Sequence, residues 1–118
     1  MKYAMLVYSD QSAWDGLSDE EAARLRAESM PRWISLFDEM GKADPSVQGR
    51  ELVSAAEAKV VRVVDGKTIV TDGPFAETKE QIGGYFVAEC KDLDQAIELA
   101  QHIPVVTTGS VEIRPIAE

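Results

Sequence analysis

The chain has 118 residues, 45% hydrophobic and 28% charged, which is typical of one soluble globular domain spanning residues 1–118. This composition excludes a disordered chain, a collagen-like chain and, with Cys90 as its one cysteine, a disulfide scaffold. The net charge of −9 argues against free nucleic acid and anionic membranes as partners. The opening apolar run, residues 3–8, is too short for a signal segment or a membrane span, so we expect a cytoplasmic protein.

The first third of the chain predicts a strand and then a long helix. Residues 3–8 are apolar at every position, as in a buried strand. Ser18, three residues before Glu21, predicts the capping box that begins a helix. We expect this helix to be kinked at Pro31 and to end at Gly41. Its buried side is predicted from residues at helical spacing. They are Ala22, Leu25, Ser29, Trp33, Leu36, Phe37 and Met40.

The middle of the chain predicts a hairpin. Residues 42–58 carry only a weak pattern, which favours a short strand and a loop. Asp65-Gly66 then separates two β-branched runs, residues 59–64 and 67–71. An Asp-Gly pair in this position is typical of a two-residue β-turn, because the turn needs positive φ angles.

The last part of the chain predicts a strand, a helix and a final strand. The expected segments are a loop over residues 72–84, a strand over 85–90, a helix with Asp92 as its N-cap that ends at Pro104, and a strand over 111–115. The buried side of this helix is predicted as Leu93, Ala96, Ile97, Ala100 and Ile103. In the final strand, Val111, Ile113 and Pro115 alternate with polar residues, as in a half-buried strand.

This order of elements indicates an α+β fold of the ferredoxin-like type, a mainly antiparallel sheet with two helices on one face. Such a sheet leaves its second face uncovered. A second copy of the chain is the simplest cover, so we expect a homodimer whose sheets face each other, a dimeric α/β-barrel type of assembly.

The segment from Thr71 to Tyr85 is the candidate functional site, since it sets charged residues between Gly73-Pro74 and Gly83-Gly84. One hypothesis is a small-molecule site with cofactor-free acid/base chemistry, such as an isomerisation or elimination. Asp72 and Glu77 are then the candidate catalytic bases. The candidate substrate-binding residues are Lys79 as an electrostatic clamp and Tyr8, Phe75 and Tyr85 as apolar walls.

Two other hypotheses fit the same residues. The acidic dimer could be a non-catalytic protein that binds a basic surface of a regulatory protein. Alternatively the loop is structural, with Asp72 capping the turn and ion pairs of its charged residues holding the dimer together.

Several stretches of the sequence resemble one known family. They are residues 3–8, 65–67, 71–85, 92–96 and 109–115, and the run Asp-Gly-Pro-Phe-Ala-Glu-Thr-Lys-Glu at 72–80 is the most specific. On these residues the chain resembles the DGPF subfamily of the YCII-related proteins over nearly its whole length. The resemblance implies the dimeric ferredoxin-like fold and a regulatory context beside sigma factors in transcription, but it implies no reaction.

The wider family has a proposed His-and-Asp active site whose histidine lies on the first helix. This chain has Ser29-Met30-Pro31-Arg32-Trp33 in that region, so the pair is not carried over. The single histidine, His102, is expected to sit at the end of the second helix without a catalytic role.

We expect no metal site and no cofactor. One histidine and one cysteine far apart cannot form a His/Cys zinc site. Carboxylates alone could bind Mg²⁺ or Ca²⁺, but no spacing signal points to such a site, and no EF-hand, P-loop or dinucleotide-binding pattern is present. Cys90 is expected in the core, and Trp33 in the core or a dimer interface. Trp14 fits equally a pocket wall or the packing of its loop.

Overall fold

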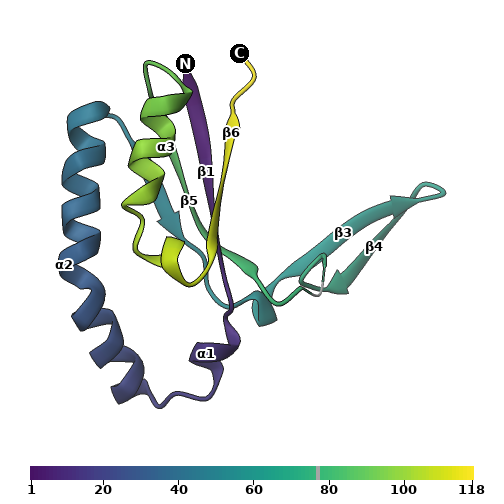
Figure 1. The fold of residues 1–118 in the computed structure, drawn as a ribbon. Coiled ribbons are helices and arrows are strands. Elements are labelled where there is room, and N and C mark those ends of the chain that lie inside the picture. Colours follow the sequence, from purple (N-terminus) through teal and green to yellow (C-terminus); the bar gives the residue numbers. More distant parts are fainter. Residues whose placement is uncertain (77) are drawn as a thin grey trace.

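The computed structural model describes residues 1–76 and 78–118, apart from the side chains of residues 106 and 107, and contains two antiparallel sheets and three α-helices within that range (Figure 1). The strands are β1 (Lys2–Ser9), β2 (Gln48–Glu51), β3 (Lys59–Val64), β4 (Lys67–Asp72), β5 (Gln81–Glu89) and β6 (Ser110–Pro115). The helices are α1 (Ser12–Asp15), α2 (Asp19–Ala43) and α3 (Leu93–Gln101), with short 3-10 turns η1 (Ala55–Glu57) and η2 (Pro104–Thr107).

The main sheet has the strand order β2-β5-β1-β6, and all its neighbouring strands are antiparallel. Helices α2 and α3 lie on one face of this sheet (Figure 1). The predicted α+β plan, an antiparallel sheet with helices on one face, is therefore confirmed. Although α2 has 25 residues, neither it nor another helix in the described part of the chain combines the length and apolar character needed to cross a bilayer.

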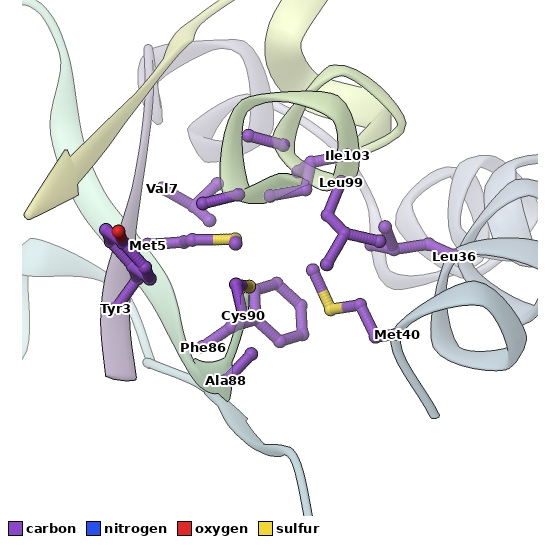
Figure 2. Close-up of a cluster of buried hydrophobic side chains, with 12 residues drawn as sticks. Tyr3, Met5, Val7, Leu36, Met40, Phe86, Ala88, Cys90, Leu99 and Ile103 are labelled. Atoms are coloured by element: carbon purple, nitrogen blue, oxygen red, sulfur yellow. The ribbon is translucent and has the colours of Figure 1, made fainter. Parts of the chain in front are cut away.

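The core lies between the main sheet and the two long helices (Figure 2). Alternate residues of β1, among them Met5, point toward the helices and meet Met40 of α2 and the residues that end α3. Cys90 is 2% exposed, as predicted, and burial raises the pKa of its thiol. The largest fully buried side chains are Met5, Leu36, Met40, Cys90 and Ile103.

Helix α2 begins as predicted and ends later than predicted. The Glu21 N–H donates to Ser18 Oγ at 3.1 Å, which closes the first turn. The helix continues through Pro31, and also through Gly41 to Ala43, so the predicted end at Gly41 is wrong. Asp44 ends it with an extended backbone, since it precedes Pro45 and proline disfavours a helical residue before it.

Only part of each predicted helical stripe is buried. On α2, Leu25 and Phe37 are 37% and 50% exposed, because the core contacts of this helix concentrate around Leu36 and Met40. On α3, the Gln95 N–H donates to the predicted cap Asp92 at 2.9 Å. Of the five residues predicted to be buried, Ala96, Ala100 and Ile103 just after the helix are buried as expected, whereas Leu93 and Ile97 are exposed. Leu99 of α3 is also buried, although it was not predicted.

The predicted hairpin is present, and the strand after it is longer than predicted. Asp65 and Gly66 have φ angles of 51° and 76°, as the tight turn requires. Strands β3 and β4 pair with each other and form their own two-stranded sheet. Strand β5 begins at Gln81 rather than at residue 85, because the segment 81–84 pairs with the end of β1 and with β2.

Asp44 is a buried carboxylate that joins three parts of the fold. It is 8% exposed, and its Oδ1 accepts from the backbone N–H and the hydroxyl of Ser46 at 2.9 and 2.6 Å. Its Oδ2 accepts from the Glu89 N–H at 2.9 Å. The Ser46 hydroxyl, followed by the two backbone N–H groups, holds the pKa of Asp44 below its ordinary value of 3.8. The carboxylate thus ties the end of α2 to the turn before β2 and to the end of β5.

We expect Asp44→Asn to lower the free energy of unfolding by about 2 kcal/mol at pH 7, because hydrogen bonds to a buried charged group are lost or weakened. Since the folded-state pKa of Asp44 is lowered, its contribution is complete above the unfolded-state pKa and disappears as pH falls through the folded-state value. Urea unfolding at pH 7 and at pH 3 measures both effects. The difference between wild type and variant should shrink at the lower pH.

The matched control is Asp38→Asn on the same helix, where the carboxylate is 70% exposed and pairs with Lys42 at 3.4 Å. An exposed pair of this kind contributes about 0.5 kcal/mol or less. Equal losses in the two variants would contradict the role assigned to Asp44.

Candidate functional site

The sheet face turned away from the helices, called the outer face here, carries a row of half-buried apolar side chains. In β1 the residues that alternate with the core positions are Leu6 and Tyr8. Leu6 lies opposite Tyr85 of β5, and Val87 lies two residues further along β5. Directly paired residues of antiparallel strands share a face, so these four side chains lie together on the outer face. The structure thus brings two predicted binding residues, Tyr8 and Tyr85, onto one surface.

Charged side chains border this apolar row. Arg50 of β2 lies opposite Tyr85, and Glu112 of β6 lies opposite Leu6. Arg114 of the same strand forms an ion pair with Glu112. The outer face therefore has an apolar centre on β1 and β5, with arginines on both of its edge strands.

A polar cluster lies where β1 ends and β5 and β6 begin. The Ser12 hydroxyl and N–H donate to Asp10 Oδ1 at 2.5 and 3.0 Å, and these bonds lower the pKa of Asp10, with the charge of Lys79 adding to the effect. The Ser110 hydroxyl donates to Glu80 at 2.8 Å. The predicted clamp Lys79 is exposed here, within electrostatic range of Asp10. Asp10 and Ser110 are not among the site residues predicted from the sequence.

The loop between β4 and β5 is held by local hydrogen bonds. The Gly73 N–H donates to the Ala58 carbonyl at 2.7 Å, and a Cβ at residue 73 would lie 2.9 Å from the Ala58 Cβ. Glycine is therefore required for the close approach of these two backbones. The peptide bond between Gly73 and Pro74 is cis. Further along, Gln81 Nε2 donates to the carbonyls of Ala76 and Thr78, both at 2.9 Å.

The structure places Asp72 and Phe75 at the base of the hairpin, each beside a basic residue. The Asp72 carboxylate is 83% exposed and forms an ion pair with Lys59. The Phe75 ring is 76% exposed, and the Arg62 guanidinium lies 5.2 Å from its centroid. Glu77, the second predicted base, lies outside the described residues. Tyr8 and Tyr85 therefore share the main sheet, whereas Asp72 and Phe75 belong to the hairpin and its exit.

The single histidine belongs to the helical side of the molecule. His102 follows α3 as its C-cap and is exposed, and its N–H donates to the Leu99 carbonyl at 3.1 Å. It borders two grooves between α2 and the end of α3, of about 240 and 500 Å³, that also include Glu39. Within residues 1–76 and 78–118, no three His, Cys, Asp or Glu side chains gather closely enough to hold a metal ion.

Trp14 lies in α1 rather than in a loop, and it packs against α2. Its ring lies 5.5 Å from the Arg26 guanidinium, and Arg26 pairs with Glu51 at 3.0 Å. Of the two roles that the sequence left open, this contact favours packing of the segment before α2 over a pocket wall. Trp33 is half-buried against Phe37 and Phe86, with ring centroids 6.1 and 6.5 Å away.

Comparison with known proteins identifies the family. The family model described as the YCII-related domain matches residues 1–118. An uncharacterised protein of Rhizobium meliloti (strain 1021) is 38% identical to this chain over 122 residues, which cover 99% of the chain and 93% of the relative.

We expect Asp72→Asn to change the melting temperature by no more than about 2–3 °C, because an ion pair exposed on both sides contributes little to stability. Gly73→Ala, one residue further on, should lower it clearly, since the new Cβ would collide with Ala58. Differential scanning calorimetry of both variants tests this. A large loss in Asp72→Asn would assign Asp72 to the structure of the loop and would make that variant unsuitable as a probe of chemistry.

Proposed function

Since the chain belongs to the family of YCII-related domains, we propose that it acts as a homodimer that binds a small organic molecule between the outer face of its sheet and the loop after β4. The observation that carries this proposal is the outer face itself. Leu6, Tyr8, Tyr85 and Val87 form an apolar row there, and no helix or strand of the described residues lies over it (Figure 1). An apolar surface that no other element covers is typical of an interface or a ligand site.

The homodimer follows from the need to cover this face. Two copies related by a two-fold axis would place the same residues of each sheet against the other, which gives a closed assembly. The arginines and Glu112 on the edge strands would then border the apolar centre, as polar residues border most interfaces. This arrangement is the dimeric barrel expected from the sequence.

The ligand would lie at the end of this interface where the loop after β4 meets the sheet. Tyr8 and Tyr85 offer apolar ring faces with a phenol at the tip, and Phe75 adds an exposed ring from the loop. Lys79 supplies a positive charge for an anionic group of the ligand. A second copy would exclude water from these side chains, which strengthens such electrostatic contacts.

The chemistry that these residues support is proton transfer without a cofactor. A carboxylate, Asp72 or Glu77, would take a proton from a carbon beside a carbonyl group, and the negative charge formed on the ligand oxygen would be stabilised by Lys79. In a ligand with a carbon–carbon double bond next to that carbon, return of the same proton to the far end of the double bond completes an isomerisation. All atoms and electrons are then accounted for by the ligand and the carboxylate.

We expect the wild-type protein to be dimeric in sedimentation velocity, and Leu6→Arg to raise the dissociation constant at least about a hundredfold. The reason is that the variant places unpaired charges from both copies in the interface. Circular dichroism of the variant checks that the fold is kept.

The matched control is Leu93→Arg, on an exposed position of α3 at the opposite side of the sheet. This variant should remain dimeric. A wild-type protein that is monomeric at about 100 µM would rule out the dimer.

We expect the protein to accelerate exchange of solvent deuterium into small keto acids and cyclic ketones, followed by proton NMR in D₂O. Asp72→Asn should reduce this exchange by about a hundredfold or more if Asp72 is the base, in line with the usual contribution of a general base. Tyr85→Ala should weaken ligand binding, measured by saturation-transfer NMR.

Binding without exchange would reject the acid/base step while keeping the ligand site. Loss of exchange in Glu77→Gln but not in Asp72→Asn would assign the base to Glu77. A dimer that binds none of these compounds would reject the ligand site and leave a non-catalytic regulatory role as the remaining hypothesis.

A further inference from the structure

The hairpin formed by residues 59–72, called the arm here, exposes apolar side chains that nothing in the described chain covers. On one of its faces Val61 lies opposite Val70, and Val63 follows on the same strand. These three valines are 63%, 60% and 68% exposed. Because β-branched residues stabilise a strand mainly through packing, an apolar face of this kind needs a surface to pack against.

The arm is not supported as part of a larger sheet. Its two strands pair only with each other within the described residues, and one backbone hydrogen bond, from Gly73 to Ala58, closes its base. A two-stranded hairpin is at best marginally stable alone in water. The opposite face of the arm is partly covered at the middle of its strands, where Arg62, opposite Ile69, lies over the Phe75 ring. The opposite face also exposes Val64 and Ile69, at 47% and 43%, but Val61, Val63 and Val70 are more exposed, so the valine face has the greater need of a partner.

The direction of the arm indicates that a second copy of the chain is the partner that covers the valine face. Figure 1 shows the arm leaving the body on the side of the main sheet opposite to α2 and α3. It projects beside the space in front of the outer face, where we have proposed that a second copy lies. Strands of six residues extend about 20 Å, whereas two packed sheets lie about 10 Å apart. The arm is thus long enough to pass the sheet of a second copy and reach the level of its helices.

Charge favours the same partner. Residues 59–72 contain Lys59, Arg62 and Lys67 against Asp65 and Asp72, a net charge of +1 in a chain whose total is −9. The rest of the chain therefore carries −10. An arm of opposite sign is attracted to the body of another copy, which would otherwise be repelled by its like charge.

From these observations we propose that the arm of each copy packs its valine face, Val61, Val63 and Val70, against the body of the other copy in the dimer. The two arms exchange around the two-fold axis. Asp72 and Phe75 at the base of each arm then lie between the two copies, so the candidate site contains residues from both. This inference rests on the proposed dimer, and it adds an interface that the sheet-to-sheet contact does not require.

The test is an isotope-filtered NOE experiment on a mixed dimer. Protein with ¹³C-labelled valine and leucine methyl groups is unfolded together with unlabelled protein and refolded. We expect intermolecular NOEs from the methyl groups of Val61, Val63 and Val70. A dimer with intermolecular NOEs only from Leu6 and Val87 would overturn the arm exchange and leave the sheet-to-sheet dimer intact. A monomer would overturn both proposals.

A pair of variants on neighbouring positions of β4 gives a second test. Val70→Lys changes the valine face, and we expect it to raise the dimer dissociation constant about tenfold or more, as substitutions at well-packed interface positions do. Thr71→Lys adds the same charge on the opposite face of the same strand and should leave the constant within about threefold of wild type. Equal behaviour of the two variants would contradict packing through the valine face.

Discussion

A β-sheet has two faces, and in this chain helices cover only one of them. The alternation along β1 shows the consequence at the level of single residues. Met5 and Val7 are buried beneath the helices, whereas Leu6 between them and Tyr8 after them stay half-buried on the other side. The remaining architecture depends on how this second face is covered. In the proposed dimer, the second copy covers this face, the ligand site lies at the end of the same interface, and the exchanged arms add a further contact between the two copies.

Much of the fold could be predicted from the sequence where the signal is local. The caps Ser18 and Asp92 act on N–H groups three residues away, and the Asp65-Gly66 turn joins adjacent strands, so each is visible in a short window. The end of α2 was predicted wrongly because a residue outside the helical pattern determines where the helix ends. Gly41 had the usual composition of a helix end, but the effect of Pro45 on Asp44 set the real end of α2.

The candidate site could be predicted only in part, because it depends on pairing between distant strands. The alternation of β1 and β5 places Tyr8 and Tyr85 on one face, and both were selected from the sequence. The bond between Ser110 and Glu80 depends on the register that β6 adopts against β1, which no local pattern contains. The same holds for Asp44, whose role appears only when the end of β5 is placed beside it.

The position of β1 in the middle of the sheet also affects how the protein is made. Its hydrogen-bonding partners are β5 and β6. Lys2 can therefore pair only after Glu89 has been synthesised, and Tyr3 can pair with β6 only after Pro115 has been synthesised. A ribosome adds about 5–20 residues per second, and β1 therefore stays unpaired for several seconds after it emerges. During that interval α2 and the hairpin can already form from contacts close in sequence. Strand β1 is thus paired only after β5 and β6 have been synthesised, and its apolar residues are exposed to other nascent chains until then.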